Sequence, residues 1–534
     1  MRKLRIGIID LVSNSARPGL WARVMNANFA SIMPQVVATW CEARGHEVSL
    51  TCYTGFEDLS HELPAKPDLV FIGAFTEAAQ LAYALSQLFR SQGAITVLGG
   101  PHARCYPQDA RQYFDYVLGF TDETVIGDVL RDCSRHRPLG MCLSASTQPV
   151  SLPGVRERWK FLEATLRKAP LIKIVPMIGS LGCPYTCNFC IDAGVPYQPV
   201  DAAVIKEDLH FLLTKLRRPH VGWHDPNFGV RFNDAMQTIE EAVPPDRIDF
   251  IAESSLSVLS EDHVRRLKRN GFKVLLPGIE SWYELGEKSK TGGATGVEKV
   301  REVSEQVNMI LRHVPYVQAN FVLGLDSDAG EEPFELTKRF LDMTPGAFPA
   351  FSLLTAFGQA AVANLDYQRA GRVLSFPFHF LNNCRAINVR VKNYEWPDFY
   401  SHVIDVTCFA CSSRMIARRF RVNGVGIPGW LNVIRALSSE GAGRIKYYRQ
   451  VRHRLDHDRP FRAYFEQDTD ELPPVYSDTI WRDLGPFWPL LPKGALHHDP
   501  NAYLKSVSVR ASLPLQETPA TNPREATSAA LHQN

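Results

Sequence analysis

The feature that most constrains this chain is a run of three cysteines, Cys183, Cys187 and Cys190, directly after a short apolar segment. That segment, residues 172–178, is typical of a buried strand, so the cysteines lie on the loop that follows a strand. A cubane iron–sulfur cluster is normally held by four thiolates, and three leave one iron with an open coordination position. The pattern therefore predicts a reactive 4Fe-4S cluster at the carboxyl end of a strand, where barrel enzymes place their active sites.

Two other uses of these cysteines remain open. The three thiolates could hold a zinc ion together with a histidine such as His210 or His224, although zinc ligands usually come as two separated pairs. Disulfides are disfavoured because all three cysteines lie within eight positions. The apolar run before Asp10 is also too short for a secretion signal. Eleven cysteines without a framework spacing fit a reducing compartment, and we expect a cytoplasmic protein.

Length and charge narrow the other possibilities. The chain of 534 residues is long enough for two or three domains, and 45% hydrophobic and 22% charged residues are ordinary for globular proteins. The net charge of +2 gives no indication of a nucleic-acid or membrane partner. The longest apolar runs are about nine residues, against roughly 20 for a membrane span, so no transmembrane segment is expected.

Residues 1–140 alternate strand and helix patterns. Helices are expected over residues 30–44 and 77–91, and strands over residues 4–11, 48–53, 68–72, 94–98 and 115–118. Turn residues follow the strands at their carboxyl ends. This is an α/β pattern that predicts a doubly wound parallel sheet of flavodoxin or Rossmann type, whose ligands bind at those ends.

A connector, residues 141–170, separates this domain from a second α/β series over residues 171–400. After the cysteine loop, helices are expected over residues 202–215 and 261–270. Further strands are expected over residues 220–224, 248–253, 274–276, 317–323 and 351–355. Together with residues 172–178 they make six strands, each followed by helical sequence.

The last part of the chain differs in character. Residues 401–508 look helical and hold two arginine clusters, around Arg418 and Arg452, which we interpret as solvated helix faces rather than an anion site. Cys408 and Cys411 cannot hold a second cluster alone, and their role is left open. Residues 509–534 are rich in Thr, Pro, Ala and Ser, which predicts a disordered tail.

The C-x3-C-x2-C spacing, with Phe189 before the third cysteine, resembles the signature of radical S-adenosylmethionine (SAM) enzymes. The resemblance implies that the cluster binds SAM at its open iron. It also implies that an electron donor such as flavodoxin or ferredoxin reduces the cluster. In that family the six strand–helix repeats form a partial (β/α)6 TIM barrel.

The first domain resembles the cobalamin-binding domain that precedes many radical SAM domains. The matching pieces are Asp-Leu-Val-Phe-Ile-Gly at 68–73, Val-Leu-Gly-Gly-Pro-His at 97–102 and Asp-Tyr-Val-Leu-Gly at 115–119. The resemblance implies cobalamin against Gly73, Gly99, Gly100 and Gly119, where absent side chains allow a close approach. The chain departs from this pattern in two places. The Asp-x-His-x-x-Gly motif, which supplies a lower-axial histidine in other cobalamin proteins, is absent. The Gly-Glu-Gly-Glu that usually follows the fifth strand is replaced by residues 119–123. The alternative is a flavodoxin-like domain that binds nothing, or only the substrate.

Further cofactor-binding residues follow from the strand ends. Phe189 is a candidate for the adenine of SAM, and Glu253, Glu280 and Ser281 for its ribose or amine, because a buried carboxylate suits an ammonium partner. Gly278 and Gly324 are expected to pack closely near the nucleoside. Residues 354–359 are expected to line the substrate cavity. No catalytic residue is assigned.

The sequence thus predicts a radical SAM enzyme, and a cobalamin-dependent methyltransferase acting on an unactivated carbon. Two alternatives remain: a radical rearrangement, oxidation or cyclisation without cobalamin, and a non-catalytic iron–sulfur or metal-binding protein such as a redox sensor. The substrate is expected to be a small molecule or a lipid, with no nucleic-acid partner. A lipid, an antibiotic intermediate, a tetrapyrrole and a peptide are all compatible with the sequence.

Overall fold

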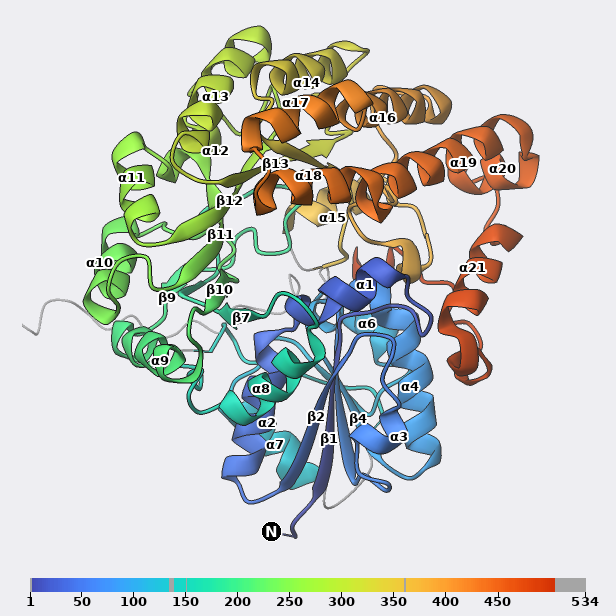
Figure 1. Cartoon of the computed structure of the whole chain (residues 1–534). Helices are drawn as coiled ribbons and strands as arrows, with labels where there is room; N and C mark the ends of the chain where they lie inside the picture. The colour runs from blue at the N-terminus through green and yellow to red at the C-terminus, as the bar shows by residue number, and fades with distance from the viewer. Residues whose placement is uncertain (1, 134–138, 150, 360–361, 505–534) are drawn as a thin grey trace, which may run out of the picture.

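The computed structural model describes residues 2–133, 139–149, 151–359 and 362–504. Two six-stranded parallel sheets form the two halves of the molecule, and a set of helices from the C-terminal part covers one side (Figure 1). The predicted α/β class, with a doubly wound sheet, a partial barrel and a helical C-terminal region, is confirmed. The segment predicted to be a disordered tail, residues 509–534, lies outside the described residues.

The first sheet has the strand order β2-β1-β3-β4-β5-β6, which is the flavodoxin-like order with one further strand. Its strands are β1 Arg5–Leu11, β2 Glu47–Tyr53, β3 Leu69–Ala74, β4 Ile95–Gly99, β5 Tyr116–Leu118 and β6 Met141–Leu143. Its main helices are α2 Ile32–Ala43, α4 Ala79–Ser91, α5 Pro101–Cys105 and α7 Glu123–Asp132. The strand order reverses between β1 and β3, and in such folds ligands bind at the carboxyl ends beside that reversal.

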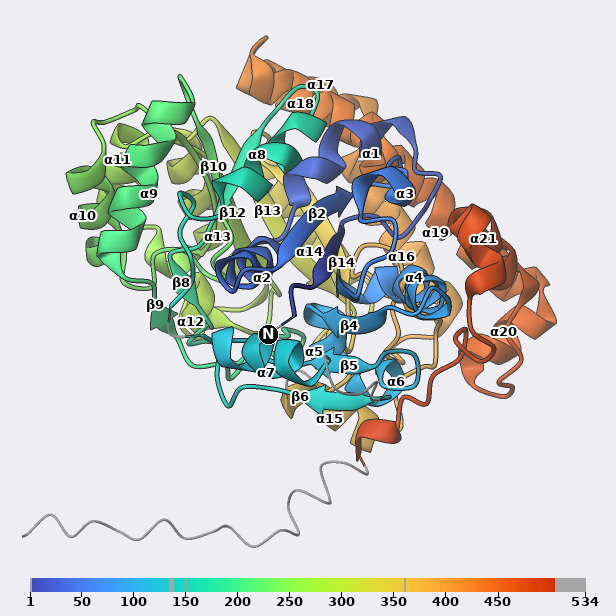
Figure 2. The ribbon, with the colours of Figure 1, turned by 90° about the horizontal axis from the view of Figure 1, so that it is seen from below.

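The expected connector carries structure of its own. Met141–Leu143 pairs in parallel with Tyr116–Leu118 and forms the edge of the first sheet (Figure 2). Helix α8, Trp159–Lys168, follows it. The sequence pattern did not show the strand because β6 is three residues long and none of them is fully buried.

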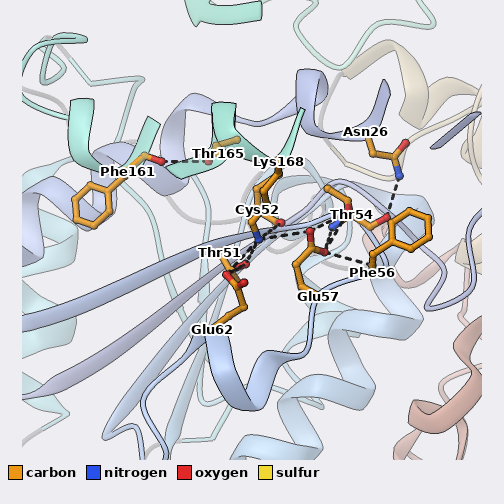
Figure 3. A network of polar contacts seen from close by, with 10 residues as sticks. All are labelled: Asn26, Thr51, Cys52, Thr54, Phe56, Glu57, Glu62, Phe161, Thr165 and Lys168. Atoms are coloured by element: carbon orange, nitrogen blue, oxygen red, sulfur yellow. Dashed lines mark hydrogen bonds and ion pairs between the residues drawn. The ribbon is translucent and has the colours of Figure 1, made fainter. Parts of the chain in front are cut away.

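Helix α8 is held to the first sheet by the side chain of Lys168 (Figure 3). Its ammonium donates to the Thr51 hydroxyl at 2.7 Å and to the Cys52 carbonyl at 3.1 Å. It also pairs with Glu57 at 3.4 Å and Glu62 at 3.2 Å. On the other side of the connector, buried Arg158 donates to the Gln35 side chain at 2.6 Å and to the Pro176 carbonyl at 2.8 Å. Lys168 therefore fixes α8 to the first domain, and Arg158 connects that domain to β7 of the barrel.

The second sheet runs in chain order, β7-β10-β11-β12-β13-β14, and all neighbours are parallel. The strands are β7 Ile174–Met177, β10 His220–Trp223, β11 Asp249–Ser255, β12 Phe272–Glu280, β13 Tyr316–Leu323 and β14 Phe348–Leu353. The covering helices are α9 Ala202–Lys215, α10 Phe232–Ala242, α11 Glu261–Arg269, α13 Gly296–Leu311 and α14 Glu332–Met343. Because β7 and β14 are not paired, the sheet is a partial barrel with one open side, as predicted.

The C-terminal helices are α16 Trp396–Ala410, α17 Ser413–Asn423, α18 Ile427–Leu437, α19 Arg444–His457, α20 Arg459–Glu466 and α21 Pro474–Leu484. Helix α16 packs against α14 and α19, and the turn after α21 contacts α4 of the first domain. The shorter helices are α1 Leu20–Met25, α3 Leu59–Glu62, α6 Pro107–Ala110, α12 Gly286–Ser289 and α15 Val362–Arg369. Within the described residues, no helix has the length and apolar character needed to cross a bilayer.

Candidate functional site

The cysteine loop leaves the carboxyl end of β7 and is closed by a short antiparallel pair, β8 Ser180–Leu181 with β9 Gln198–Pro199. Gly182 has φ +69°, and a side chain there would overlap the carbonyl oxygen of Pro196. A glycine is therefore needed for the turn. Immediately after it, the Cys183 amide donates to the Val195 carbonyl at 3.1 Å. The loop thus has a fixed base, from which the three thiols project.

The three thiols share one environment. Cys187 is buried, and Cys183 and Cys190 are half-buried. Burial raises the pKa of each thiol, to about 11 for Cys190, and the nearby Lys288 ammonium acts in the opposite direction on all three. Thiolates are the ligands that iron–sulfur clusters require, so a cation beside the loop suits a cluster. The donor set and its surroundings fit a cluster held by three cysteines.

A single zinc ion would need its ligands much closer together than a cubane, which spreads its thiolates over separate irons. Across the described ranges, no three His, Cys, Asp or Glu side chains are arranged to hold one metal ion. His210 lies on the exposed face of α9, and His224 lines the cavity between the two domains that is described below. The geometry therefore gives no support to a zinc site completed by either histidine.

Asp225, at the end of β10, connects the cysteine loop to the barrel. Its carboxylate accepts from the Gly179 amide at 2.7 Å and from the Ser180 hydroxyl at 2.6 Å. The side chain is buried, and this burial raises the pKa of the carboxyl to about 6, although the hydrogen bonds oppose the rise. Asp225 therefore positions the start of the loop.

Replacing Asp225 with asparagine should change how stability depends on pH. The folded-state pKa of about 6 lies above the ordinary value of 3.8, so the folded protein binds the proton more tightly. The contribution of the Asp225 carboxyl to the free energy of unfolding is therefore largest at low pH and is lost as pH rises from about 4 to about 6. The free energy of unfolding of the wild type, relative to Asp225→Asn, should fall by about 3 kcal/mol across that window.

Urea unfolding at a series of pH values checks this expectation, with Asp262→Asn as the control. The Asp262 side chain is 94% exposed, so its replacement should leave the pH dependence unchanged. A difference between wild type and Asp225→Asn that stays constant from pH 4 to pH 7 would show that Asp225 ionises normally.

The predicted SAM residues Glu253, Glu280 and Ser281 do come together near the loop, but they have different partners. Glu280 pairs with Lys288 at 2.7 Å, and both side chains are largely buried. The Ser281 hydroxyl accepts from the amides of Tyr283 and Glu284 and so caps a turn. The Glu253 side chain has no hydrogen bond or ion pair among the described residues. Of the three, Glu253 has the carboxylate free to receive an amine.

Glu253 is accessible to solvent from the barrel mouth but has protein around it. The surrounding protein displaces water from the Glu253 carboxyl. This loss of solvation, together with the negative charge of the neighbouring Glu280, raises the pKa of the Glu253 carboxyl. Gly278 leaves room for the ion pair of Glu280 and Lys288, because a side chain at position 278 would overlap the Glu280 carboxylate. Gly324 instead packs against Phe399 and Val391, and Phe189 packs against the main core.

Lys288 was not predicted, because its role depends on an unusual turn. Glu280, Leu285 and Lys290 all have positive φ, three of the five non-glycine residues of this kind in the described chain. Such conformations are strained and gather at functional sites. The turn brings α12 back so that Lys288 faces both Glu280 and the thiols. Sequence spacing alone gave no signal of this contact.

A cavity of about 350 Å³ lies between the two domains, within the range of cofactor sites. Its walls on one side are the ends of β3, β4 and β5, and on the other side the cysteine loop and the end of β10. The lining includes the four predicted glycines and three residues of the loop: Gly73, Gly99, Gly100, Gly119, Leu181, Gly182 and Asp192. The structure therefore places the glycine turns and the cysteine loop on one shared cavity.

The four glycines differ in what they permit. A side chain at Gly99 would meet no atom within 4 Å and would project into the cavity. Gly100 has φ +89°, and its Cβ would lie 2.9 Å from the Ala74 carbonyl oxygen. A Cβ at Gly119 would lie 2.6 Å from the Ser144 hydroxyl, and one at Gly73 would be 3.1 Å from Pro34. Only Gly99, among these four, leaves space that a ligand rather than protein would fill.

Arg104, on α5, links the two sides of this cavity. Its guanidinium donates to the Ile191 carbonyl at 2.6 Å and to the Asp192 carboxylate at 3.2 Å, and it lies 4.9 Å from the Phe120 ring centroid. It holds the loop that carries Cys190 against the first domain. We did not predict this role of Arg104. The one indication in the sequence is that Arg104 comes shortly after the Gly-Gly-Pro-His turn at 99–102.

Two histidines lie near the glycine turns. His102 is fully buried and its ring bonds to the Tyr83 hydroxyl at 2.7 Å, so it supports the core. His224 lines the cavity from the barrel side, and burial lowers the pKa of its imidazole to about 4. It would be neutral at physiological pH.

Residues 354–359 do not line this cavity. The Tyr106 hydroxyl donates to the Ala356 carbonyl at 3.1 Å, and the Gln359 amide donates to the Cys105 carbonyl at 3.0 Å. These residues form a contact between the barrel and the first domain, which sequence spacing does not reveal, and their place along a substrate cavity stays a prediction.

No protein-family model matches the chain. Two curated proteins from Chlorobaculum tepidum, bacteriochlorophyllide d C-12(1)-methyltransferase and bacteriochlorophyllide d C-8(2)-methyltransferase, are each 24% identical to it, over 296 and 319 residues. The alignments cover 54% and 57% of this chain. They span 64% of the first relative and 69% of the second, or about two thirds of each.

Solved structures share the fold across most of the chain. TsrM from Kitasatospora setae, a radical SAM methyltransferase with tryptophan and a SAM analogue bound, matches 70% of this chain and 78% of its own, with a TM-score of 0.51 and 15% identity. OxsB, a cobalamin-dependent SAM radical enzyme with aqua-cobalamin and SAM bound, matches 95% of this chain and 80% of its own, with a TM-score of 0.53 and 11% identity. The resemblance predicted from the cysteine spacing and the glycine turns is confirmed.

Proposed function

We propose that this chain, which has the fold of the cobalamin-dependent radical SAM enzymes, is a methyltransferase that acts on an unactivated carbon. One observation carries the proposal: the glycine turns of the first domain and the cysteine loop of the barrel line the same cavity. A cofactor bound at the turns would face the loop directly. The two curated relatives that are named methyltransferases support the reaction type.

The residues fit three cofactors, namely a 4Fe-4S cluster, SAM and cobalamin. Cys183, Cys187 and Cys190 would hold the cluster, Glu253 would receive the amine of SAM, and the open space above Gly99 would take the edge of the corrin. When bound, the cluster supplies the electron that cleaves SAM and cobalamin carries the methyl group. Arg104 and Asp225 keep the loop in register with the two domains.

The proposed substrate is a small molecule or a lipid. The names of the two bacteriochlorophyllide methyltransferases favour a tetrapyrrole as the first compound to test. The tryptophan bound in TsrM shows that a protein with this fold also takes a much smaller substrate. We further propose a cytoplasmic location and a flavodoxin or ferredoxin as the electron donor.

Gly99→Val should strongly reduce retention of cobalamin without unfolding the protein. Gly99 ends a strand, where valine is well tolerated, and the new side chain would enter the cavity rather than the protein. Filling ligand space in this way should weaken binding by at least about tenfold. The measurement is the cobalamin absorption that remains with the protein after gel filtration.

The matched control is Gly19→Val, because Gly19 also has open space around it but lies outside the cavity. It should retain cobalamin as the wild type does. Retention by Gly99→Val at the wild-type level would place the corrin elsewhere. If the wild type itself retains none, the methyl-transfer proposal fails, and radical rearrangement, oxidation or cyclisation without cobalamin becomes the better proposal.

A further inference from the structure

Helix α18 exposes an apolar face to solvent. Ile427, Trp430, Ile434 and Leu437 recur at intervals of three and four residues, which places them on one side of the helix. They are 79%, 54%, 46% and 64% exposed. Val422 and Val425, on the preceding turn, are 57% and 78% exposed. Six of the 16 large exposed hydrophobic residues in the described chain lie within these 16 positions, so they form a patch rather than scattered contacts.

The orientation of the helix is fixed by its other face. Arg435 points inward, where its guanidinium lies 4.1 Å from the Phe348 ring centroid and donates to the Tyr316 hydroxyl at 2.7 Å. Gly429, Asn432 and Ala436 are buried on the same side. The helix therefore turns its charged residue toward the protein and four of its large apolar residues toward solvent, while Leu431 packs against the protein. Surface helices usually show the opposite arrangement, with apolar residues toward the protein. A rotation of α18 that buried its exposed apolar residues would break the contacts of Arg435 with Phe348 and Tyr316.

The sequence around the patch is strongly basic. Residues 413–455 contain ten arginines and lysines and a single acidic residue, although the whole chain has nearly equal numbers of both signs. That acidic residue, Glu440, is already paired with Arg435 at 2.7 Å. Arg414, Arg421, Lys446 and Arg449 are exposed on the two helices that flank α18. Arg414 pairs with Asp342 at 3.4 Å, and Arg449 donates to the Cys408 sulfur at 3.4 Å. Arg421 and Lys446 have no ion pair among the described residues, so their positive charge is available to an external partner.

We propose that α17 and α18 bind the surface of an anionic lipid bilayer. An apolar face with a tryptophan, beside arginines and lysines, is the composition of helices that lie in the membrane interface. The apolar side chains would enter the acyl boundary, and the flanking cations would meet anionic headgroups. Figure 2 shows both helices at the outer edge of the molecule, where a flat surface can reach them.

Two other partners fit less well. A nucleic acid would use the arginines but would leave six apolar side chains in water, since its backbone offers them nothing apolar. A second copy of this chain would cover the apolar patch but would bring two basic segments together. The bilayer satisfies both the apolar and the charged residues, and the proposal does not depend on the catalytic one.

Sedimentation with vesicles tests the proposal on the full chain. The protein should pellet with vesicles of equal parts phosphatidylcholine and phosphatidylglycerol, and much less with phosphatidylcholine alone. Ile427→Glu with Leu437→Glu should reduce the bound fraction at least about tenfold, because both side chains would carry charge into the acyl boundary. Arg421→Glu with Lys446→Glu should reduce it in low salt, and added salt should weaken wild-type binding.

Leu171→Glu with Val297→Glu is the matched control, because these residues are 76% and 48% exposed but lie far from α18 in sequence and on other elements. It should bind as the wild type does. Circular dichroism should show all variants folded, and light scattering should show them of equal size. No pelleting of the wild type, or pelleting that the α18 pair leaves unchanged, would overturn the proposal. A wild-type dimer that the α18 pair converts to a monomer would do so as well, and would assign the patch to a second copy.

Discussion

Alanine at any one of Cys183, Cys187 and Cys190 should abolish reductive cleavage of SAM. Wild-type protein, reconstituted with iron and sulfide without air, is expected to be brown and to hold about four irons per chain. On reduction it should release 5′-deoxyadenosine slowly even without substrate, because one iron lacks a protein ligand. Loss of one thiolate leaves too few ligands to hold the cluster, so the rate should fall about a thousandfold or more. Iron content and 5′-deoxyadenosine measured by chromatography provide the check.

The matched control is Cys411→Ala. Cys411 follows the last turn of α16 and is half-buried, as Cys183 and Cys190 are, but it lies on a different part of the fold. Its replacement should leave iron content and SAM cleavage unchanged. Colourless wild-type protein with one zinc per chain would contradict the cluster, and a stable cluster that never cleaves SAM would favour a redox sensor.

The sequence predicted the two sheets because most of their strands have a continuous apolar and largely buried stretch. A parallel strand covered by helices reads as a continuous apolar run, as Val175–Met177 and Leu69–Ile72 do. The edges of the sheets were harder to predict. The expected strand at 351–355 begins earlier, at Phe348. The edge strand Met141–Leu143 lies within the predicted connector, and the sequence gives no signal for it because none of its residues is fully buried.

At the candidate site, the predictable residues are those whose roles are local. Cys183, Cys187 and Cys190 share one loop, so their spacing alone indicates their chemistry. Lys288 and Arg104 act across a turn and across a domain boundary, and no short-range pattern records such contacts. The arginine clusters around Arg418 and Arg452 were predicted as solvated helix faces, but no pattern in the sequence indicates that the apolar side chains of α18 stay exposed beside them.

Lys288→Met should destabilise the protein by about 3 kcal/mol or more and should strongly reduce SAM cleavage. Burial lowers the pKa of Lys288, but Glu280 and the thiolates of Cys187 and Cys190 outweigh it and raise that pKa overall. The methionine would leave the Glu280 carboxylate buried without a cation, and breaking a buried pair in this way is expensive. Urea unfolding and 5′-deoxyadenosine release measure the two effects.

A double-mutant cycle separates the ion pair from other effects of the substitution. Glu280→Gln with Lys288→Met removes both charges, so it should recover at least about 1 kcal/mol relative to the sum of the single variants. SAM cleavage should stay low in the double variant, because the cation beside the thiols is still missing. Lys290→Met is the control, since Lys290 lies two residues further along the same turn and is exposed. Equal losses at Lys288 and Lys290, or strictly additive effects of Glu280→Gln and Lys288→Met, would show that the turn matters and the ion pair does not.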